Sequence, residues 1–143
     1  METTPQLVRS TVAIAGLAAA AVGAAAQTQA DSSRTVVSGV YTAEQATHGE
    51  TVFKNVCANC HTTSQFTGTA FLKPWVGRPV YSLYDQIRTT MPQDNPGGLS
   101  RAEYLSVITY ILKLNGFPAG TTPLPDEDAT LKQIRFDTPP GSS

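Results

Sequence analysis

Two cysteines and one histidine form a compact group near the middle of this 143-residue chain. They occupy the string Cys57-Ala58-Asn59-Cys60-His61, and the chain has no other cysteine. This spacing is typical of covalent haem attachment, in which two thiols add to the vinyl groups of the porphyrin. The histidine that follows is held below the porphyrin plane, where a ring nitrogen can ligate the iron. The sequence therefore predicts one haem c, bound covalently through Cys57 and Cys60, with His61 as an axial ligand.

A single methionine is available for the other face of the iron. Apart from the initiator, Met91 is the only methionine, and it lies in a loop setting, Thr89-Thr90-Met91-Pro92. Histidine and methionine together are a common ligand pair in electron-carrying cytochromes. The one other histidine, His48, precedes Cys57 by nine residues and would lie on the attachment side of the chain. We therefore expect Met91 to be the second axial ligand.

Other chemistry is possible for the same residues. A cysteine pair in an oxidising compartment can be a redox-active dithiol or a structural disulfide. A closed zinc site fits poorly, because it requires four ligands and the two cysteines and two histidines have the wrong spacing. Met91 could instead fill a gap in the core, as methionine often does. A titration that finds two reactive thiols in the mature protein would contradict haem attachment.

The first thirty residues have the features of an export signal. Arg9 precedes an apolar, alanine-rich run over residues 12–26, and Thr28-Gln29-Ala30 offers a small-x-small cleavage site. The run is shorter than the about 20 apolar residues that span a membrane. We expect residues 1–30 to be a signal peptide cleaved after Ala30, which places the protein in the periplasm. The alternative is an uncleaved anchor with the protein facing the periplasm, and only then do we expect contact with a membrane.

The elements that must position these residues are predicted to be helices. Capping boxes at Thr42 with Gln45, and at Ser100 with Glu103, mark two helix starts. The first helix leads into Cys57, a second is expected over residues 79–89, and the last ends at Asn115-Gly116. No alternating apolar pattern predicts a strand, so the fold class is all-α, with about three main helices.

The chain divides into segments by composition. Residues 31–40 form a polar lead-in and residues 41–120 the helical domain. Residues 121–143 are a C-terminal extension, which we expect to be extended and partly disordered. Its apolar residues could lie against the domain; they are Leu124, Leu131, Ile134 and Phe136.

Over residues 41–120 the sequence resembles a class I bacterial c-type cytochrome. The residues that carry the resemblance lie before, within and after the haem motif: Gly49, Phe53, Cys57 to His61, Thr90-Met91-Pro92, Pro96 to Ser100, Tyr104 and Tyr110 to Leu112. The resemblance implies a monohaem cytochrome c fold in which the first and last helices cross, with Gly49 and Phe53 meeting Tyr104 or Ile108. The ending Asn115 to Gly120 resembles cytochromes associated with periplasmic quinoprotein dehydrogenases.

The resemblance fails after the haem motif. Members of the family often carry a proline there, whose carbonyl accepts the histidine Nδ1 hydrogen, whereas residues 62–68 contain none. We expect a backbone carbonyl near Gln65 to take this role. Trp75 and Arg78 follow, and both offer N–H donors that suit a haem propionate. The alternative is that Trp75 belongs to the core and Arg78 to the solvated surface.

Filled axial positions leave no open site for a substrate on the iron, and no group of acids and bases suggests catalysis. We expect a monomeric carrier of single electrons between redox proteins, such as a quinoprotein dehydrogenase or a terminal oxidase, and no nucleic-acid partner. The alternative is a gas or redox sensor with a labile methionine ligand. Residues 51–101 contain five basic and two acidic side chains. The haem face is therefore either mildly basic, which would steer an acidic partner, or of mixed charge.

Overall fold

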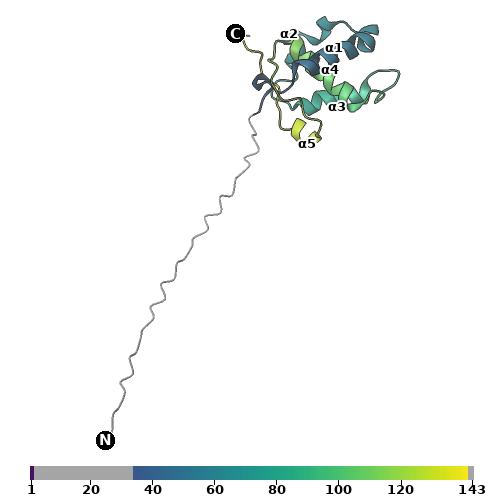
Figure 1. Ribbon diagram of the computed structural model, residues 1–143. Coiled ribbons are helices and arrows are strands. Elements are labelled where there is room, and N and C mark those ends of the chain that lie inside the picture. Colours follow the sequence, from purple (N-terminus) through teal and green to yellow (C-terminus); the bar gives the residue numbers. More distant parts are fainter. Residues whose placement is uncertain (2–33, 142–143) are drawn as a thin grey trace.

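The structure, a computed structural model, describes Met1 and residues 34–141 (Figure 1). Apart from Met1, the predicted signal peptide lies outside the described residues, as do its cleavage site after Ala30 and the first residues of the lead-in. In the part of the chain that is described, no helix is long and apolar enough to cross a lipid bilayer.

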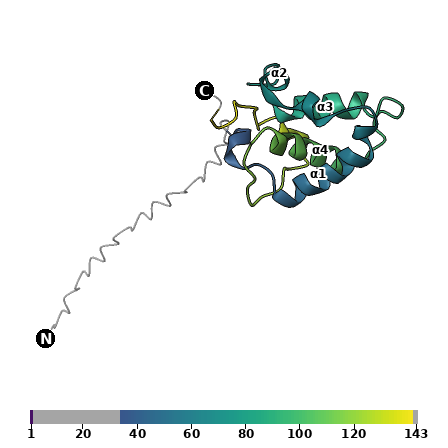
Figure 2. The same cartoon turned by 90° about the horizontal axis from the view of Figure 1, so that it is seen from above.

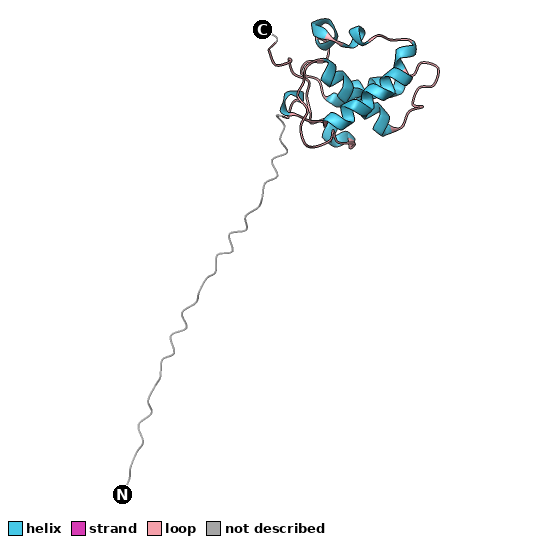
Figure 3. Ribbon diagram, turned by 45° about the horizontal axis from the view of Figure 1, so that its top comes forward, coloured by secondary structure: helices cyan, strands magenta, loops and turns pink. Residues whose placement is uncertain are grey.

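The described residues fold into helices joined by loops, and none of them forms a β-strand (Figure 3). The all-α prediction is thus confirmed. In chain order the elements are η1 (Val36–Ser38), α1 (Ala43–Asn55), η2 (Cys57–Asn59), η3 (Thr63–Phe66), α2 (Gly68–Leu72), α3 (Val80–Thr90), α4 (Arg101–Leu114) and α5 (Asp128–Leu131). The three longest helices are the three that the sequence predicts.

Both predicted capping boxes are present. The Thr42 side chain accepts a hydrogen bond from the Gln45 backbone N–H at 3.2 Å, and the Gln45 side chain accepts from the Thr42 N–H. Ser100 and Glu103 make the same reciprocal pair at the start of α4. At the other end of α4, Gly116 has a φ of 76°, a left-handed conformation that suits glycine at a helix end. These local signals fix where α1 and α4 begin and where α4 stops.

The contact between α1 and α4 is the most extensive between any two elements and lies near the middle of the molecule (Figure 2). Gly49 makes it possible, since a Cβ atom there would overlap the Ser106 carbonyl and lie 3.0 Å from the Tyr110 Cβ. The Phe53 ring packs on Tyr110 with 5.6 Å between ring centroids. The atoms nearest to a Cβ at Gly49 thus belong to Ser106 and Tyr110 rather than to the expected Tyr104 or Ile108. The Tyr104 hydroxyl instead forms hydrogen bonds with the backbone of the loop that precedes α4.

The terminal segments complete the core. Val36 and Val40, which lie in the predicted polar lead-in, are fully buried, a difference from the sequence interpretation. The four apolar residues of the C-terminal extension named above are also buried. Two isolated β-bridges join Arg135 to Thr35 and to Pro79, so the extension runs between the lead-in and the start of α3. An ion pair of 2.6 Å between Arg101 and Asp128 ties α4 to α5.

Candidate haem site

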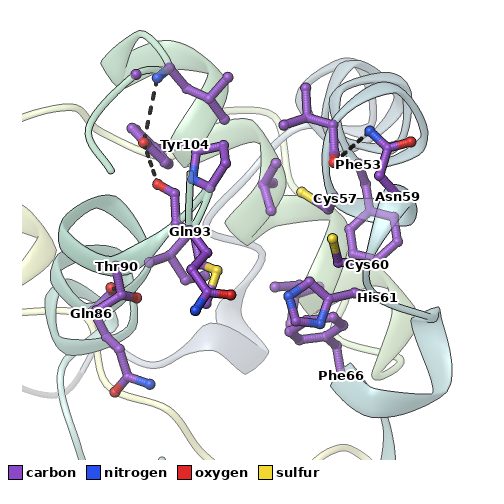
Figure 4. A pocket seen from close by; sticks show the side chains of 18 of the residues that line it. Phe53, Cys57, Asn59, Cys60, His61, Phe66, Gln86, Thr90, Gln93 and Tyr104 are labelled. Carbon is purple, nitrogen blue, oxygen red and sulfur yellow. Dashed lines mark hydrogen bonds between the residues drawn. The ribbon is translucent and has the colours of Figure 1, made fainter. Parts of the chain in front are cut away.

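A cavity of about 990 Å³ lies between the end of α1, the C-terminal part of α3 and the loop that follows it. The sulfurs of Cys57 and Cys60 and the His61 ring approach it from one side, and Gln86, Gln93 and Tyr104 lie across from them (Figure 4). Apolar side chains make up most of the walls: Phe53, Val56, Phe66, Phe71, Trp75, Leu83, Ile87, Leu99, Val107 and Ile111. The volume lies at the upper end of the range for pockets that enclose small molecules, about 300–1,000 Å³.

The haem motif occupies a tight turn at the end of α1. The backbone N–H groups of Cys60 and His61 both donate to the Cys57 carbonyl, at 3.1 and 2.9 Å. This 3-10 turn brings the two cysteines and the histidine to the same cavity. The Asn59 amide donates to the carbonyls of Asn55 and Val56, at 3.4 and 3.3 Å, and so fastens the turn to the helix. The two residues between the cysteines therefore form one turn of backbone, which places both sulfurs at the cavity.

The His61 ring is held on two sides. Phe66 meets it edge to face, with 5.3 Å between ring centroids. The Nδ1 atom lies 3.3 Å from the side-chain oxygen of Gln65. The expected partner, a backbone carbonyl near Gln65, is thus replaced by the Gln65 side chain itself. The sequence does carry a signal for this contact, because Thr62 and Gln65 have the spacing of a capping box, but a helix as short as η3 shows no periodicity to support it.

Met91 lies at the C-terminal cap of α3, half-buried, and lines the same cavity as His61. Its backbone N–H and its backbone carbonyl are both held by hydrogen bonds. The N–H donates to the Ile87 carbonyl at 2.8 Å, and the carbonyl accepts a 2.7 Å hydrogen bond from the Tyr104 hydroxyl. The Leu99 N–H donates to that same hydroxyl at 3.4 Å. Tyr104 therefore fastens both ends of the 91–99 loop to α4, a role that the sequence did not reveal.

The two proposed propionate donors differ in position. Trp75 is buried and lines the cavity. Arg78 is exposed and does not line it; its guanidinium carbon lies 4.9 Å from the centre of the Trp75 ring. The structure thus brings Trp75 together with the predicted ligands and leaves Arg78 behind it. His48 also lies outside the cavity, with Nδ1 3.0 Å from the Ser106 hydroxyl on α4.

Asn115 is a second residue whose role the sequence only partly indicated. The sequence predicts that it ends the last helix, and it does cap α4. Its side chain also reaches the segment after the haem motif, donating to the Phe66 carbonyl at 2.7 Å and accepting from the Gly68 N–H at 2.9 Å. These bonds hold η3 and α2 against the end of α4, so the segment that carries Gln65 and Phe66 has a fixed position.

The mouth of the cavity carries amides rather than charges. Its exposed lining residues include Asn55, Asn59, Gln86, Gln93 and Asn95. Among the described residues that line the cavity, Asp94 is the one charged side chain, and no cation is present. Three of the five basic residues counted above are engaged in ion pairs elsewhere: Lys54 with Glu50, Arg88 with Asp85 and Arg101 with Asp128. The structure therefore does not support a basic haem face.

The donor set suits a haem and suits dithiol chemistry less well. Burial raises the pKa of the Cys57 thiol, whereas a cysteine used for thiol–disulfide exchange has its pKa lowered. The cavity instead joins apolar walls, two sulfurs one turn apart, an imidazole and a methionine. These are the groups that hold a covalently attached porphyrin and its iron.

Comparison with known families agrees with this geometry. Residues 44–111 match the family described as cytochrome c oxidase, cbb3-type, subunit III. The matched segment runs from the start of α1 into α4 and contains both cysteines, His61 and Met91. Comparisons with curated proteins and with solved structures found no match. Because the matched family, the helical fold and the cysteine spacing agree, residues 44–111 form a class I monohaem c-type cytochrome domain, whose cofactor is haem c attached covalently through Cys57 and Cys60.

Proposed function

We propose that this haem-based electron carrier transfers one electron at a time between redox proteins in the periplasm, with His61 and Met91 as axial ligands. The observation that carries the proposal is the placement of Met91 on the cavity that also receives His61. Haem c supplies an iron that cycles between Fe(III) and Fe(II). A thioether ligand favours the ferrous state more than a stronger donor does, so it raises the potential.

The residues around the cavity serve this chemistry by excluding water and by holding the two ligands still. Phe53, Val107 and Ile111 form an apolar wall contributed by α1 and α4. Tyr104 holds the backbone of Met91, and Phe66 packs on His61. Small movement of the ligands between oxidation states lowers the reorganisation that electron transfer requires. Cys60 is exposed, so the thioether side is where an electron would enter or leave.

Replacement of Met91 by alanine tests the ligation directly. The wild-type ferric protein should show the weak red-end absorbance band of an Fe–S bond, and Met91→Ala should lose this band and have a lower midpoint potential. Gln93→Ala, two residues along the same loop and also at the cavity, is the matched control and should keep the band. If the band persists in Met91→Ala, another group ligates the iron and the proposed ligand pair is wrong.

A sensor that releases its methionine is the alternative function. It requires Met91 to leave the iron readily, and the hydrogen bonds of its N–H and carbonyl to Ile87 and Tyr104 oppose this. Carbon monoxide distinguishes the two functions. An electron carrier should bind little of it in the reduced state at neutral pH, whereas rapid stoichiometric binding would favour the sensor.

The matching family, described as subunit III of a cbb3-type cytochrome c oxidase, favours a terminal oxidase over a quinoprotein dehydrogenase as the partner. The cavity mouth, where amides predominate and Asp94 is the one charged side chain, suggests that the partner docks without long-range steering, because steering needs a strongly charged surface of one sign. The rate of oxidation by ferricyanide should then change little with ionic strength. A steep fall of this rate with added salt would indicate a basic docking face after all.

A further inference from the structure

The side chain of Gln65 is held in a defined orientation next to the axial histidine. Its amide oxygen, Oε1, accepts a hydrogen bond from the Thr62 backbone N–H at 2.9 Å. The backbone N–H of Gln65 donates to the Thr62 carbonyl at 3.1 Å, within the turn of η3. Although the residue is exposed, these bonds close a capping box that limits the motion of the amide.

The same oxygen decides which nitrogen of His61 carries the hydrogen. A backbone N–H can only donate, so the amide atom that faces the Thr62 N–H must be the oxygen rather than the nitrogen. His61 Nδ1 lies 3.3 Å from this oxygen. Two acceptors would repel each other, so Nδ1 must carry the hydrogen and donate. In the neutral ring the lone pair then belongs to Nε2, which is the tautomer able to ligate iron.

We propose that Gln65 is the positioning residue of the axial histidine and that it sets the midpoint potential of the haem through the His61 Nδ1–H. This inference rests on the proposed ligation by His61. An acceptor at Nδ1–H increases the electron density that the imidazole gives to the metal. Greater donation favours Fe(III) over Fe(II), so the hydrogen bond from His61 to Gln65 lowers the potential.

In this chain a side chain accepts the His61 Nδ1 hydrogen, because the proline whose carbonyl often does so in the family is missing. Residues 62–68 contain no proline whose carbonyl could accept the hydrogen. Among the residues that the structure describes, the Gln65 amide is the group placed to accept it. The Gln65 side chain accepts the hydrogen that a backbone carbonyl commonly accepts. Unlike a backbone carbonyl, this side chain can be replaced by mutation. The potential of this cytochrome is therefore open to adjustment at one position.

Three variants of the purified holoprotein test the proposal. Gln65→Leu keeps the approximate size of the side chain but has no acceptor, so its potential should rise. Losing the partner of a metal-bound histidine typically changes metal affinity about tenfold or more. A tenfold change in the relative stability of Fe(III) and Fe(II) corresponds to about 59 mV for one electron. Gln65→Glu restores an acceptor oxygen and should bring the potential to the wild-type value or below it.

Thr62→Ala is the structural control. It removes the Thr62 hydroxyl, which lies 2.9 Å from the Ser64 hydroxyl in the same turn, but it leaves the Gln65 oxygen and the Thr62 backbone N–H in place. Its potential should match wild type even if its stability falls. The His61 Nδ1–H should also exchange with solvent faster in Gln65→Leu than in Thr62→Ala, as measured by NMR of the reduced protein.

The outcomes separate this inference from the proposed function. The red-end Fe–S band reports Met91 ligation and should be retained in all three variants. If the band is present but Gln65→Leu shifts the potential no more than Thr62→Ala does, Gln65 has only a structural role. If Gln65→Leu does not retain haem, Gln65→Glu decides, since a potential above wild type would contradict the proposal. If the wild-type protein itself does not show the band, the proposed pair of ligands, His61 and Met91, is wrong.

Discussion

Replacing Gly49 with alanine should destabilise the protein although alanine favours helices. The added Cβ would overlap the Ser106 carbonyl on α4 and lie 3.0 Å from the Tyr110 Cβ. A backbone carbonyl in mid-helix cannot rotate away, so α1 and α4 must move apart. Separation also weakens the packing of Phe53 on Tyr110, whose ring centroids are now 5.6 Å apart.

Two opposing terms set the size of the effect. Alanine gains about 1 kcal/mol over glycine inside a helix. Overpacking typically costs about 1–3 kcal/mol, and the upper end applies here because the obstacle is backbone. The expected net loss is about 2 kcal/mol. That is a substantial part of the about 5–15 kcal/mol that stabilises a typical domain, but it is not enough to unfold it.

The measurement is guanidinium unfolding of the ferric holoprotein, followed by far-UV circular dichroism. Gly49→Ala should lower the midpoint concentration with little change in slope. Thr51→Ala is the matched control, since it adds an alanine to the exposed side of the same helix and should change the midpoint little. A Gly49→Ala protein as stable as wild type would show that the two helix backbones do not approach so closely.

Two further predictions follow from contacts near the site. Tyr104→Phe removes the 2.7 Å hydrogen bond to the Met91 carbonyl; it should cost about 1 kcal/mol of unfolding free energy and weaken the red-end Fe–S band. An unchanged band would show that this bond does not help to hold the ligand. The hydrogen bond from Arg101 lowers the pKa of Asp128, so its stabilising effect is present at neutral pH and is lost as the pH falls through that lowered value. Asp128→Asn should therefore make the unfolding midpoint less dependent on pH below about 4, and an unchanged acid profile would contradict this.

Local signals were sufficient for much of the fold. The capping boxes at Thr42 and Ser100 depend on side chains three residues apart, so they are visible in the sequence and mark the helix starts correctly. Gly116 marks the end of α4 for a similar reason, because few residues other than glycine adopt its φ. The shorter helices α2 and α5 carry weaker signals, since one or two turns offer little periodicity to recognise.

Contacts between distant segments were harder to foresee. The sequence indicated that Gly49 allows a close approach, but not that Ser106 and Tyr110 are the residues approached, because this depends on the register of α4. Likewise, burial of Val36 and Val40 requires a partner surface, and the C-terminal extension that helps to provide it lies almost one hundred residues later. The roles of Tyr104 and Asn115 depend on such distant contacts in the same way.

The haem motif and the lone loop methionine identified the cofactor and the expected iron ligands, because covalent attachment requires chemistry that is local in the chain. Only the tertiary structure placed Met91 on the same cavity as His61, thirty residues away, and directed Tyr104 to its backbone. It also showed that a glutamine side chain replaces the missing proline, and that amides rather than cations surround the cavity mouth. The physical reason is that residue types determine which bonds are possible, whereas helix register and loop closure determine which groups come close enough to form them.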